Sequence, residues 1–327
     1  MRIAAAVLER FIRDLFVGIG AGARQAEATA RHMAWCEMVG RTNFGIERIP
    51  VLVKRIKAGV LAADGDMKFE KLGPSIERLD AGGGFGFDAA ERAMRRATEI
   101  AAVTGIGIVG VRNSNFFGAG AFYVNMAAQR GMIGLAMSNS FPKVVAHGGL
   151  KPVLGTNPFA FGAPQRNGDH LLFDMATSAL AGSTVRENLA RGKALPGGLA
   201  PDGALLPFGG AKGFGLALMV EMLAGVITGA GVGDGVASMY NDFARNGGNG
   251  HFMLVLDVAR WMSLDDYHMR FEALVSAVKA SGEGVLLPGE VRWENYRNNL
   301  ESGIALDAAA ASDAGAIARD AGLATPW

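Results

Sequence analysis

The sequence predicts an α/β or α+β fold, because runs with the spacing of amphipathic helices alternate with short runs of β-branched residues. The chain has 327 residues, which is enough for about two domains. Half of the residues are hydrophobic and 19% are charged, and this balance predicts a large buried core. The 47 glycines follow no collagen period, so they indicate many turns and close backbone contacts.

Charge and cysteine content exclude several classes of protein. The 32 Lys and Arg residues nearly balance the 31 Asp and Glu residues, which argues against a basic nucleic-acid surface spread over the molecule. Cys36 is the only cysteine and the five histidines are not spaced like metal ligands, so we expect no disulfide and no metal site. A reducing, cytoplasmic location fits this composition.

The N-terminal part is predicted to be helical. Alanine-rich amphipathic runs cover Val7–Val17, Arg24–Val39 and Ile49–Ala58, and Gly59 is placed to end the third. The first 16 residues lack the uninterrupted apolar centre of a signal peptide, so we expect no targeting segment.

The middle of the chain alternates between strand and helix patterns. In chain order we expect a strand–turn–strand at Met67–Leu79 with its turn at Gly73-Pro74, a glycine loop at Gly82–Gly86, a helix at Asp88–Val103, a strand at Ile106–Val111, a helix at Ala121–Arg130, a strand at Ile133–Ser138, a Gly/Pro-rich passage at Pro142–Pro164, a strand at Leu171–Phe173 ending at Asp174, a helix at Ala179–Arg191 and a loop at Gly192–Gly210.

The C-terminal third holds the most apolar stretch, Phe214–Ile227. At about 14 residues it is too short for a bilayer span of ~20, so we interpret it as a buried helix and expect no membrane association. Gly229–Gly250 is predicted to be a mobile surface connection, Phe252–Leu256 a strand and Asp265–Lys279 an amphipathic helix. The tail from Val291 onward is predicted to be helical.

Four glycine-containing or strand-end motifs are candidate ligand sites. Gly105–Gly110 matches G-x-G-x-x-G, but the glycines lie within a predicted strand, which favours a packed strand over a dinucleotide loop. Lys212 stands between glycines at a helix start and indicates either an anion site or a simple turn. The clusters Gly155–Pro158 and Asp174–Ser178 follow strands, where ligands gather in open sheets or where side chains cap helices.

Two single residues are candidates for catalysis. His147 lies in a glycine-rich loop and is the one histidine that we weigh as catalytic. Arg48 follows Gly45 where a loop leads into a helix and is able to clamp a carboxylate, although an isolated arginine more often lies on a solvated face.

Taken in order, seven motifs make the chain resemble the type-2 malate/L-lactate dehydrogenase family over nearly its whole length. They are Gly45-x-x-Arg48, Arg112-Asn113-Ser114-Asn115, Ser138-Asn139-Ser140, Gly155-Thr156-Asn157-Pro158, Asp174-Met175-Ala176-Thr177-Ser178, Leu206–Gly213 and Leu287-Pro288-Gly289-Glu290. Two further stretches, Val144–Gly148 and Phe161–Pro164, look most like the branch that reduces Δ1-piperideine-2-carboxylate and Δ1-pyrroline-2-carboxylate.

The resemblance implies a fold of two parts and a usual homodimer with its active site near the subunit interface. A helical substrate and dimer domain would combine residues 1–72 and 288–327. Residues 73–287 would form a mixed-sheet domain that binds NADH or NADPH and is not an ordinary Rossmann fold.

The resemblance also implies roles for single residues. Arg48 would hold the carboxylate of a small substrate, and Asp174 would belong to the proton-relay group. The cofactor would contact Thr156, Asn157, His170, Leu171, Leu172, Phe173, Asp174, Met175, Ala176, Ala211, Lys212, Gly289 and Glu290.

Two departures from the family pattern change the expected chemistry. The family's Ser-His-Gly-x-x-Arg, whose histidine is the proton donor, reads Asn43-Phe44-Gly45-Ile46-Glu47-Arg48 here, and Ser-x-His-Phe reads Ser114-Asn115-Phe116-Phe117. The loop Gly192–Pro207 also looks shorter. Phenylalanine supplies no proton, so His147 or Asp174 would have to serve as the acid for a ketone substrate.

These substitutions favour a cyclic imine over a ketone as substrate. An imine nitrogen is basic enough to be protonated before binding, and a phenyl face stabilises the resulting cation by ~0.5–2 kcal/mol. We therefore expect an NAD(P)H-dependent reductase of a small cyclic imino acid. The alternatives left open are a 2-hydroxy or 2-oxo acid dehydrogenase of malate/lactate type and a family member that has lost catalysis or carries out non-redox chemistry.

Overall fold

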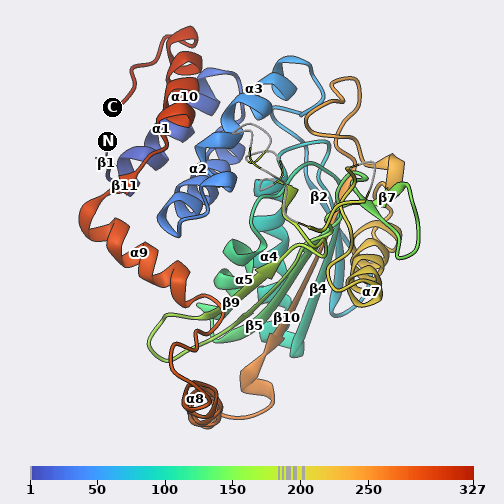
Figure 1. Ribbon diagram of the computed structural model, residues 1–327, viewed down its shortest axis with the longest axis vertical. Helices are drawn as coiled ribbons and strands as arrows, with labels where there is room; N and C mark the ends of the chain where they lie inside the picture. The colour runs from blue at the N-terminus through green and yellow to red at the C-terminus, as the bar shows by residue number, and fades with distance from the viewer. Residues whose placement is uncertain (1, 183–184, 186–187, 189–192, 194–196, 201–202) are drawn as a thin grey trace.

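The fold is organised around one seven-stranded mixed sheet with a group of helices beside it (Figure 1). The structure is a computed structural model that describes the chain except for residues 1, 183–184, 186–187, 189–192, 194–196 and 201–202. The strand order is β2 (Lys68–Lys71), β3 (Ile76–Asp80), β4 (Ile106–Ser114), β10 (Asn249–Asp257), β5 (Met132–Ser138), β8 (Phe159–Ala163) and β9 (Leu171–Met175). Within this sheet β3 and β4 run parallel, and the other neighbouring pairs are antiparallel.

The helices divide between the sheet and the chain ends. They are α1 (Ala5–Gly18), α2 (Ala23–Met38), α3 (Ile49–Lys57), α4 (Gly86–Thr104), α5 (Gly120–Ala128), α7 (Ala211–Val220), the π-helical η3 (Glu221–Val226), α8 (Leu264–Ala280), α9 (Glu290–Ser302) and α10 (Ala308–Asp320), with single turns η1 (Thr42–Phe44), η2 (Ile46–Arg48), η4 (Gly233–Gly235) and η5 (Val258–Arg260). Short strands pair β1 (Arg2–Ile3) with β11 (Ile304–Ala305), and β6 (Val144–Val145) with β7 (Pro152–Leu154).

The two chain ends pack into one helical unit. In α1, Leu8, Phe11, Ile12, Leu15 and Phe16 are buried, which is the spacing of one helix face. Their cluster includes side chains of α10, and Arg2 pairs with Ala305 between β1 and β11, so the termini lie side by side (Figure 1). The domain limits at 72/73 and 287/288 stay a prediction.

The glycines of the G-x-G-x-x-G stretch lie inside β4 and permit close packing, as predicted. A Cβ on Gly107 would lie 1.9 Å from the carbonyl oxygen of Ala97 in α4, and one on Gly110 would lie 2.9 Å from Thr228 Cγ2. Any side chain at Gly107 would therefore push α4 off the sheet. The helices α4 and α5 cover one face, while η3 packs against the other.

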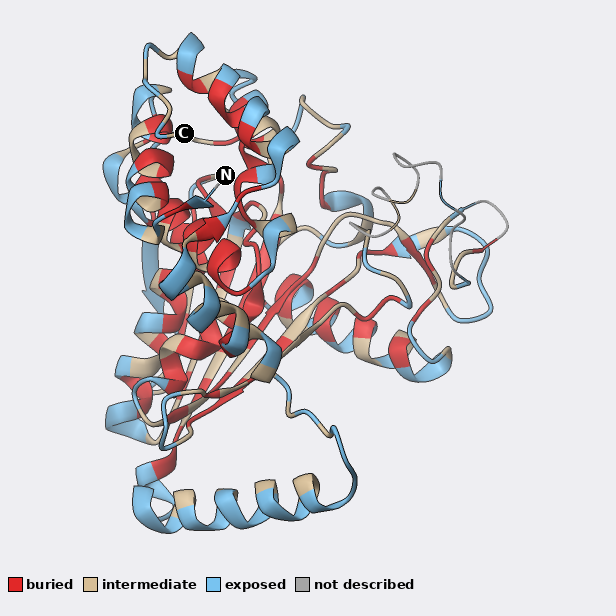
Figure 2. Ribbon diagram, turned by 60° about the vertical axis from the view of Figure 1, so that its left-hand side comes forward, coloured by how far each residue is buried: buried red, intermediate tan, exposed pale blue. Residues whose placement is uncertain are grey.

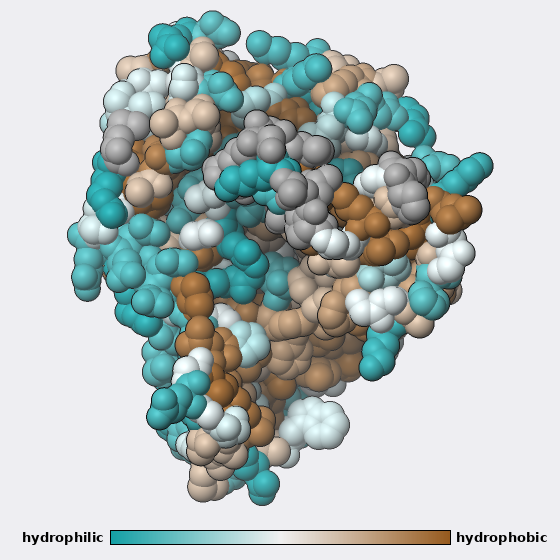
Figure 3. Space-filling model, viewed as in Figure 1, coloured by the Kyte–Doolittle hydropathy of each residue, from teal (hydrophilic) through white to brown (hydrophobic). Residues whose placement is uncertain are grey.

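Three sequence predictions were wrong. The Pro142–Pro164 passage contains strand β8, whose pairing with β5 and β9 outweighs its Gly and Pro content. Gly229–Gly250 is no surface connection throughout, because Val236, Ala237 and Met239 are buried. The stretch Phe214–Ile227 is not a buried helix but has one exposed apolar face, formed by Leu218, Met219, Met222, Val226 and Ile227 (Figure 3).

The remaining elements agree closely with the sequence predictions, with ends shifted by a few residues. Part of the helix predicted at Ala179–Arg191 and part of the loop at Gly192–Gly210 lie outside the described residues. Helix α8 is present as predicted, but none of its residues is buried, and it extends away from the sheet (Figure 2). None of the described helices has the length and apolarity needed to cross a bilayer.

Candidate active site

A cavity of about 920 Å³ lies where the helical unit meets one end of the sheet. Seven segments far apart in sequence supply its walls, so it exists only in the folded chain. Its lining includes Glu37, Arg41, Asn43, Phe44, Arg48, Phe116, Phe117, Ser138, Asn139, Ser140, Phe141, Lys143, Thr156, Asp174, Met175, Ala176, Tyr240 and Asp307.

Arg48 ends the η2 turn immediately before α3, and its side chain is held from several sides. Its Nε donates to the carbonyl of Asn43 at 2.6 Å, and its Nη1 donates to Tyr240 Oη at 2.8 Å. Arg48 is only 4% exposed, yet its guanidinium lines the cavity. A buried, oriented guanidinium suits a carboxylate, which it binds in a planar, bidentate manner.

Phe44 and Phe116 lie together next to that guanidinium. Their rings are nearly parallel, 16° apart, with centroids separated by 6.1 Å. The guanidinium carbon of Arg48 lies 5.9 Å from the Phe116 centroid. The structure thus brings together the two phenylalanines that the sequence analysis predicts to depart from the family pattern, and both are half-buried in the cavity wall.

Glu37 of α2 fixes the turn that carries Phe44 and Arg48. Its Oε1 accepts a hydrogen bond from the backbone N–H of Ile46 at 2.9 Å. A Cβ on Gly45 would lie 2.0 Å from that oxygen, so only glycine leaves room for the carboxyl group. Burial raises the pKa of Glu37 to about 7.

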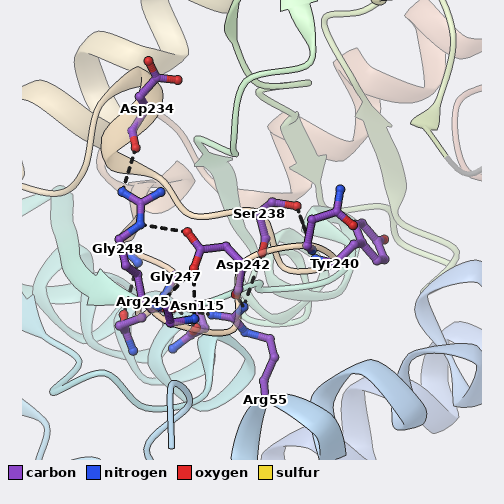
Figure 4. Close-up of polar contacts among 12 residues, drawn as sticks. Arg55, Asn115, Asp234, Ser238, Tyr240, Asp242, Arg245, Gly247 and Gly248 are labelled. Atoms are coloured by element: carbon purple, nitrogen blue, oxygen red, sulfur yellow. Dashed lines mark hydrogen bonds and ion pairs between the residues drawn. The ribbon is translucent and has the colours of Figure 1, made fainter. Parts of the chain in front are cut away.

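The segment 234–248, which connects η4 to β10, carries Tyr240 (Figure 4). The Tyr240 hydroxyl group contacts Arg48. Arg55 anchors the segment by donating to the carbonyls of Ser238 at 3.4 Å, Asp242 at 2.7 Å and Arg245 at 3.2 Å. Arg55 follows Arg48 by seven residues, about two helical turns, so both point to the same side of α3.

Segment 234–248 is also braced by its own polar groups. Asp242 Oδ1 accepts from the N–H groups of Ala244 and Arg245, and Arg245 donates from Nη1 to the carbonyl of Asp234 (Figure 4). Asn115 Oδ1 accepts from Gly247 N–H at 3.1 Å, which ties the segment to the end of β4. These contacts fix the backbone of segment 234–248 and therefore the position of Tyr240.

Asp174 lies on the edge strand β9 at another wall of the same cavity. Its Oδ2 accepts from the N–H of Ala121 at the start of α5, at 3.0 Å, and Arg292 Nη2 lies 4.0 Å away. Burial raises the pKa of Asp174, while Arg292 and the backbone amides oppose this shift. An acid in such surroundings is able to take part in proton transfer.

The predicted cofactor residues fall in three places. Thr156, Asp174, Met175 and Ala176 line the cavity. A second group lies along β9 and the start of α9: His170, Leu171, Leu172, Phe173, Gly289 and Glu290. Trp293 Nε1 donates to the His170 carbonyl, and a Cβ on Gly289, whose φ is +103°, would lie 3.0 Å from the Leu172 nitrogen.

The third group is at the start of α7, where Ala211 and Lys212 are exposed. His147 lies there as well, because its Cε1 is 3.5 Å from the Cβ position of Gly210. Its side chain is exposed. The structure therefore does not bring His147 to Arg48. Asn157 is fully buried behind Thr156, where its Nδ2 donates to Glu221 Oε2 at 2.7 Å.

Sequence reasoning missed two residues of this site, Tyr240 and Lys143. Lys143 Nζ lies 4.5 Å from the Phe141 ring centroid and 5.1 Å from that of Tyr240. The seven-residue spacing of Arg48 and Arg55 is consistent with α3 contacting another segment of the chain through both side chains. No local pattern marks Tyr240. In the part of the chain that the structure describes, no group of acidic, Cys and His side chains is arranged to hold a metal.

Comparisons with known proteins find related sequences and related structures. A family model described as malate/L-lactate dehydrogenase matches residues 3–313. An L-sulfolactate dehydrogenase of Methanothermobacter thermautotrophicus is 33% identical, over 94% of this chain and 93% of the relative. A Δ1-pyrroline-2-carboxylate/Δ1-piperideine-2-carboxylate reductase of Pseudomonas syringae pv. tomato is 32% identical over 90% of both. The solved structure of a Δ1-piperideine-2-carboxylate reductase from that species superimposes with a TM-score of 0.89, at 30% identity over 97% of this chain and 99% of the other.

Proposed function

Because the chain belongs to the malate/L-lactate dehydrogenase family, we propose that it is an NAD(P)H-dependent reductase of a small cyclic imine bearing a carboxylate. The observation that carries the proposal is the Phe44–Phe116 pair beside Arg48. The anchor for a carboxylate is present, and the two neighbouring positions that carry histidine in the family pattern are hydrocarbon rings.

The dinucleotide supplies the hydride, and the residues present suit it. The start of α7 offers backbone N–H groups and the exposed Lys212, a combination that favours phosphate. Gly289 keeps the space beside His170 and Leu172 free of a side chain. Thr156 and Ser140 present hydroxyl groups at the cavity wall, where a carboxamide would find partners.

The difference between a ketone and an imine lies in the proton. Reduction of a ketone places negative charge on oxygen, and a positioned acid accelerates this step by roughly 10²–10⁴-fold, or about 3–5 kcal/mol. An imine that binds in its protonated form already carries that proton. Among the described residues that line the cavity there is no histidine, which favours the imine.

The aromatic wall supports the same choice. A cation next to Phe44 and Phe116 gains roughly 0.5–2 kcal/mol from their faces, whereas a neutral carbonyl gains nothing comparable. The similarity to a Pseudomonas syringae reductase of such imines is further support.

A 2-oxo acid is the second candidate substrate, and Asp174 is the observation that favours it. This carboxyl group lines the cavity and its raised pKa makes it an acid nearer to neutral pH. The relatives that are named malate and sulfolactate dehydrogenases act on substrates of this class.

The test is a nicotinamide-absorbance assay with NADH and with NADPH against a panel of substrates. We expect oxidation of one cofactor with Δ1-piperideine-2-carboxylate or Δ1-pyrroline-2-carboxylate, and little with pyruvate or oxaloacetate. Equal or faster turnover of the 2-oxo acids would overturn the imine assignment. If neither NADH nor NADPH shifts the melting temperature of the protein, the redox assignment is overturned altogether.

We also propose that the enzyme is a homodimer. The exposed apolar side chains of α7 and η3, including Met222 and Ile227, would be covered in such an assembly. Sedimentation equilibrium measures the mass directly, and a monomer at micromolar concentration would contradict the proposal.

A further inference from the structure

Tyr240 is an aromatic residue of the cavity wall, and its hydroxyl group lies next to Arg48, the proposed carboxylate anchor. Its Oη lies 2.8 Å from Arg48 Nη1, and both residues line the cavity. A guanidinium has only donors, so in this hydrogen bond Arg48 donates and the tyrosine oxygen accepts. The hydrogen of the Tyr240 hydroxyl is consequently directed to an acceptor other than Arg48.

The position of that hydroxyl matches the position of the reacting atoms. In a cyclic imino acid the carbon that accepts hydride is bonded to the carboxylate carbon and to the ring nitrogen. A substrate whose carboxylate is held by Arg48 therefore has its nitrogen next to the anchor. Tyr240 Oη is already in contact with the anchor, so it lies within reach of the nitrogen.

Charged groups surround the Tyr240 side chain. Arg48 faces the oxygen from the start of α3, and Lys143 Nζ lies 5.1 Å from the ring centroid on the segment after β5. Of the acidic groups nearby, Glu47 also lines the cavity and lies 3.5 Å from Arg48, whereas Asp242 is bonded to the backbone and side chain of Arg245. Arg48 and Lys143 would together outweigh Glu47 where negative charge develops on the tyrosine oxygen.

We propose that Tyr240 is a catalytic residue that donates a proton to the substrate nitrogen when the imine binds uncharged. This inference rests on the proposed function. The C=N bond becomes a C–N bond, with hydride from the dinucleotide added to carbon and the Tyr240 proton added to nitrogen. The dinucleotide is oxidised, and the phenolate then regains a proton from water.

Other candidate acids are placed less well for this step. His147 lies at the start of α7 and does not line the cavity. Asp174 lines it from β9, held by α5 and Arg292 rather than by the anchor. Tyr240 is also fixed by Arg55 through the backbone of segment 234–248, so its distance to Arg48 is maintained (Figure 4).

The experiment compares the pH profiles of the wild-type enzyme and Tyr240→Phe with Δ1-piperideine-2-carboxylate, from about pH 6 to about pH 10. Where the imine is protonated in solution, no donor is needed, so kcat of the variant should be independent of pH there, whatever its value relative to wild type. Above the pKa of the imine, kcat of the variant should fall about tenfold per pH unit, because one proton is missing, while the wild-type kcat stays level. Parallel profiles would overturn the proposal.

Controls separate this role from a structural one. Tyr267→Phe removes a hydroxyl on α8, outside the cavity, and should leave the profile unchanged. Tyr240→His retains a proton donor that loses its proton at lower pH than a phenol, so the alkaline limb should move to lower pH. If the pH profile of Tyr240→His is identical to that of wild type, the proposal is also overturned. Tyr240→His serves as the test on its own if Tyr240→Phe does not fold.

The outcomes distinguish this proposal from the proposed function. If wild type reduces imines but the profiles are parallel, Tyr240 is not the donor and the imine assignment stands. If wild type reduces only 2-oxo acids, the imine assignment fails, and Tyr240→Phe should then lower kcat by roughly 10²–10⁴-fold at every pH. An unchanged kcat in that case would overturn the role of Tyr240 as well.

Discussion

The rings of Phe44 and Phe116 lie 16° from parallel with their centroids 6.1 Å apart, although the two residues are 72 positions apart in the sequence. One comes from the η1 turn and the other from the segment between β4 and α5. Both face the cavity that Arg48 enters. In our proposal the pair forms an apolar wall, in place of histidine, where a substrate would react.

Restoring an imidazole tests that interpretation. Phe44→His and Phe116→His should each raise kcat/KM for pyruvate or oxaloacetate, by up to about 10²-fold, because a proton donor returns to the site. Turnover of a protonated imine should change far less. Phe69→His, on the exposed edge strand β2, is the matched control. Equal gains for both substrate classes would contradict the interpretation.

Arg48 should control substrate affinity rather than the chemical step. Arg48→Met removes a buried charge-assisted contact, so we expect KM for the imino acid to rise by about 10²-fold or more, which corresponds to roughly 3 kcal/mol. Arg48→Lys should recover little, because an ammonium lacks the planar fork. Steady-state kinetics measures the effect, with Arg10→Met on the exposed surface of α1 as control. An unchanged KM would remove Arg48 from the binding site.

Arg55 should support both stability and the site. Arg55→Met leaves the carbonyls of Ser238, Asp242 and Arg245 without this donor, and the expected loss of unfolding free energy is about 2–4 kcal/mol. Urea denaturation measures the loss, and hydrogen exchange should rise at the amides of segment 234–248. Arg166→Met removes only exposed ion pairs and should cost under about 1 kcal/mol. Equal losses of unfolding free energy for Arg55→Met and Arg166→Met would show that Arg55 contributes no more than an exposed ion pair.

Glu37 predicts a dependence of stability on pH. Its pKa is about 7 in the folded chain against 4.5 for the ordinary carboxyl group, so the folded state binds the proton more tightly. The stabilisation is complete below about pH 4.5 and is lost as the pH rises toward 7, by at most roughly 3 kcal/mol. Glu37→Gln keeps an oxygen for the Ile46 N–H but does not titrate.

Urea midpoints of wild type and Glu37→Gln across that pH range measure the difference, and other titrating groups cancel in it. The urea midpoint of Glu37→Gln should rise relative to that of wild type as the pH rises. A constant difference between the two proteins would show that Glu37 does not titrate in this range.

Local patterns were sufficient for most helices and strands, because hydrophobic spacing is set by the face that each element buries. The spacing of Leu8, Phe11, Ile12, Leu15 and Phe16 is enough to predict α1 and its buried side. Strand β8 was missed because its Gly and Pro neighbours dominate the local signal, while its pairing depends on strands β5 and β9.

The candidate site was predictable only in part. Arg48 and Asp174 stand in recognisable motifs, and both line the cavity. His147 looked suitable in its glycine-rich loop, yet it lies exposed at the start of α7. Tyr240 gave no signal, because its importance depends on contact with Arg48, 192 residues away.

The sequence by itself determined the family and the mixed helix and strand content, and its resemblance to that family predicts that Phe44 and Phe116 stand where histidines are usual. These are properties of residue type and spacing, which the linear order contains. Only the tertiary structure decided that the two rings meet beside Arg48 and that Arg55 holds Tyr240 against the same guanidinium. Such contacts join distant segments, and their geometry follows from how α3, the end of β4 and segment 234–248 pack together.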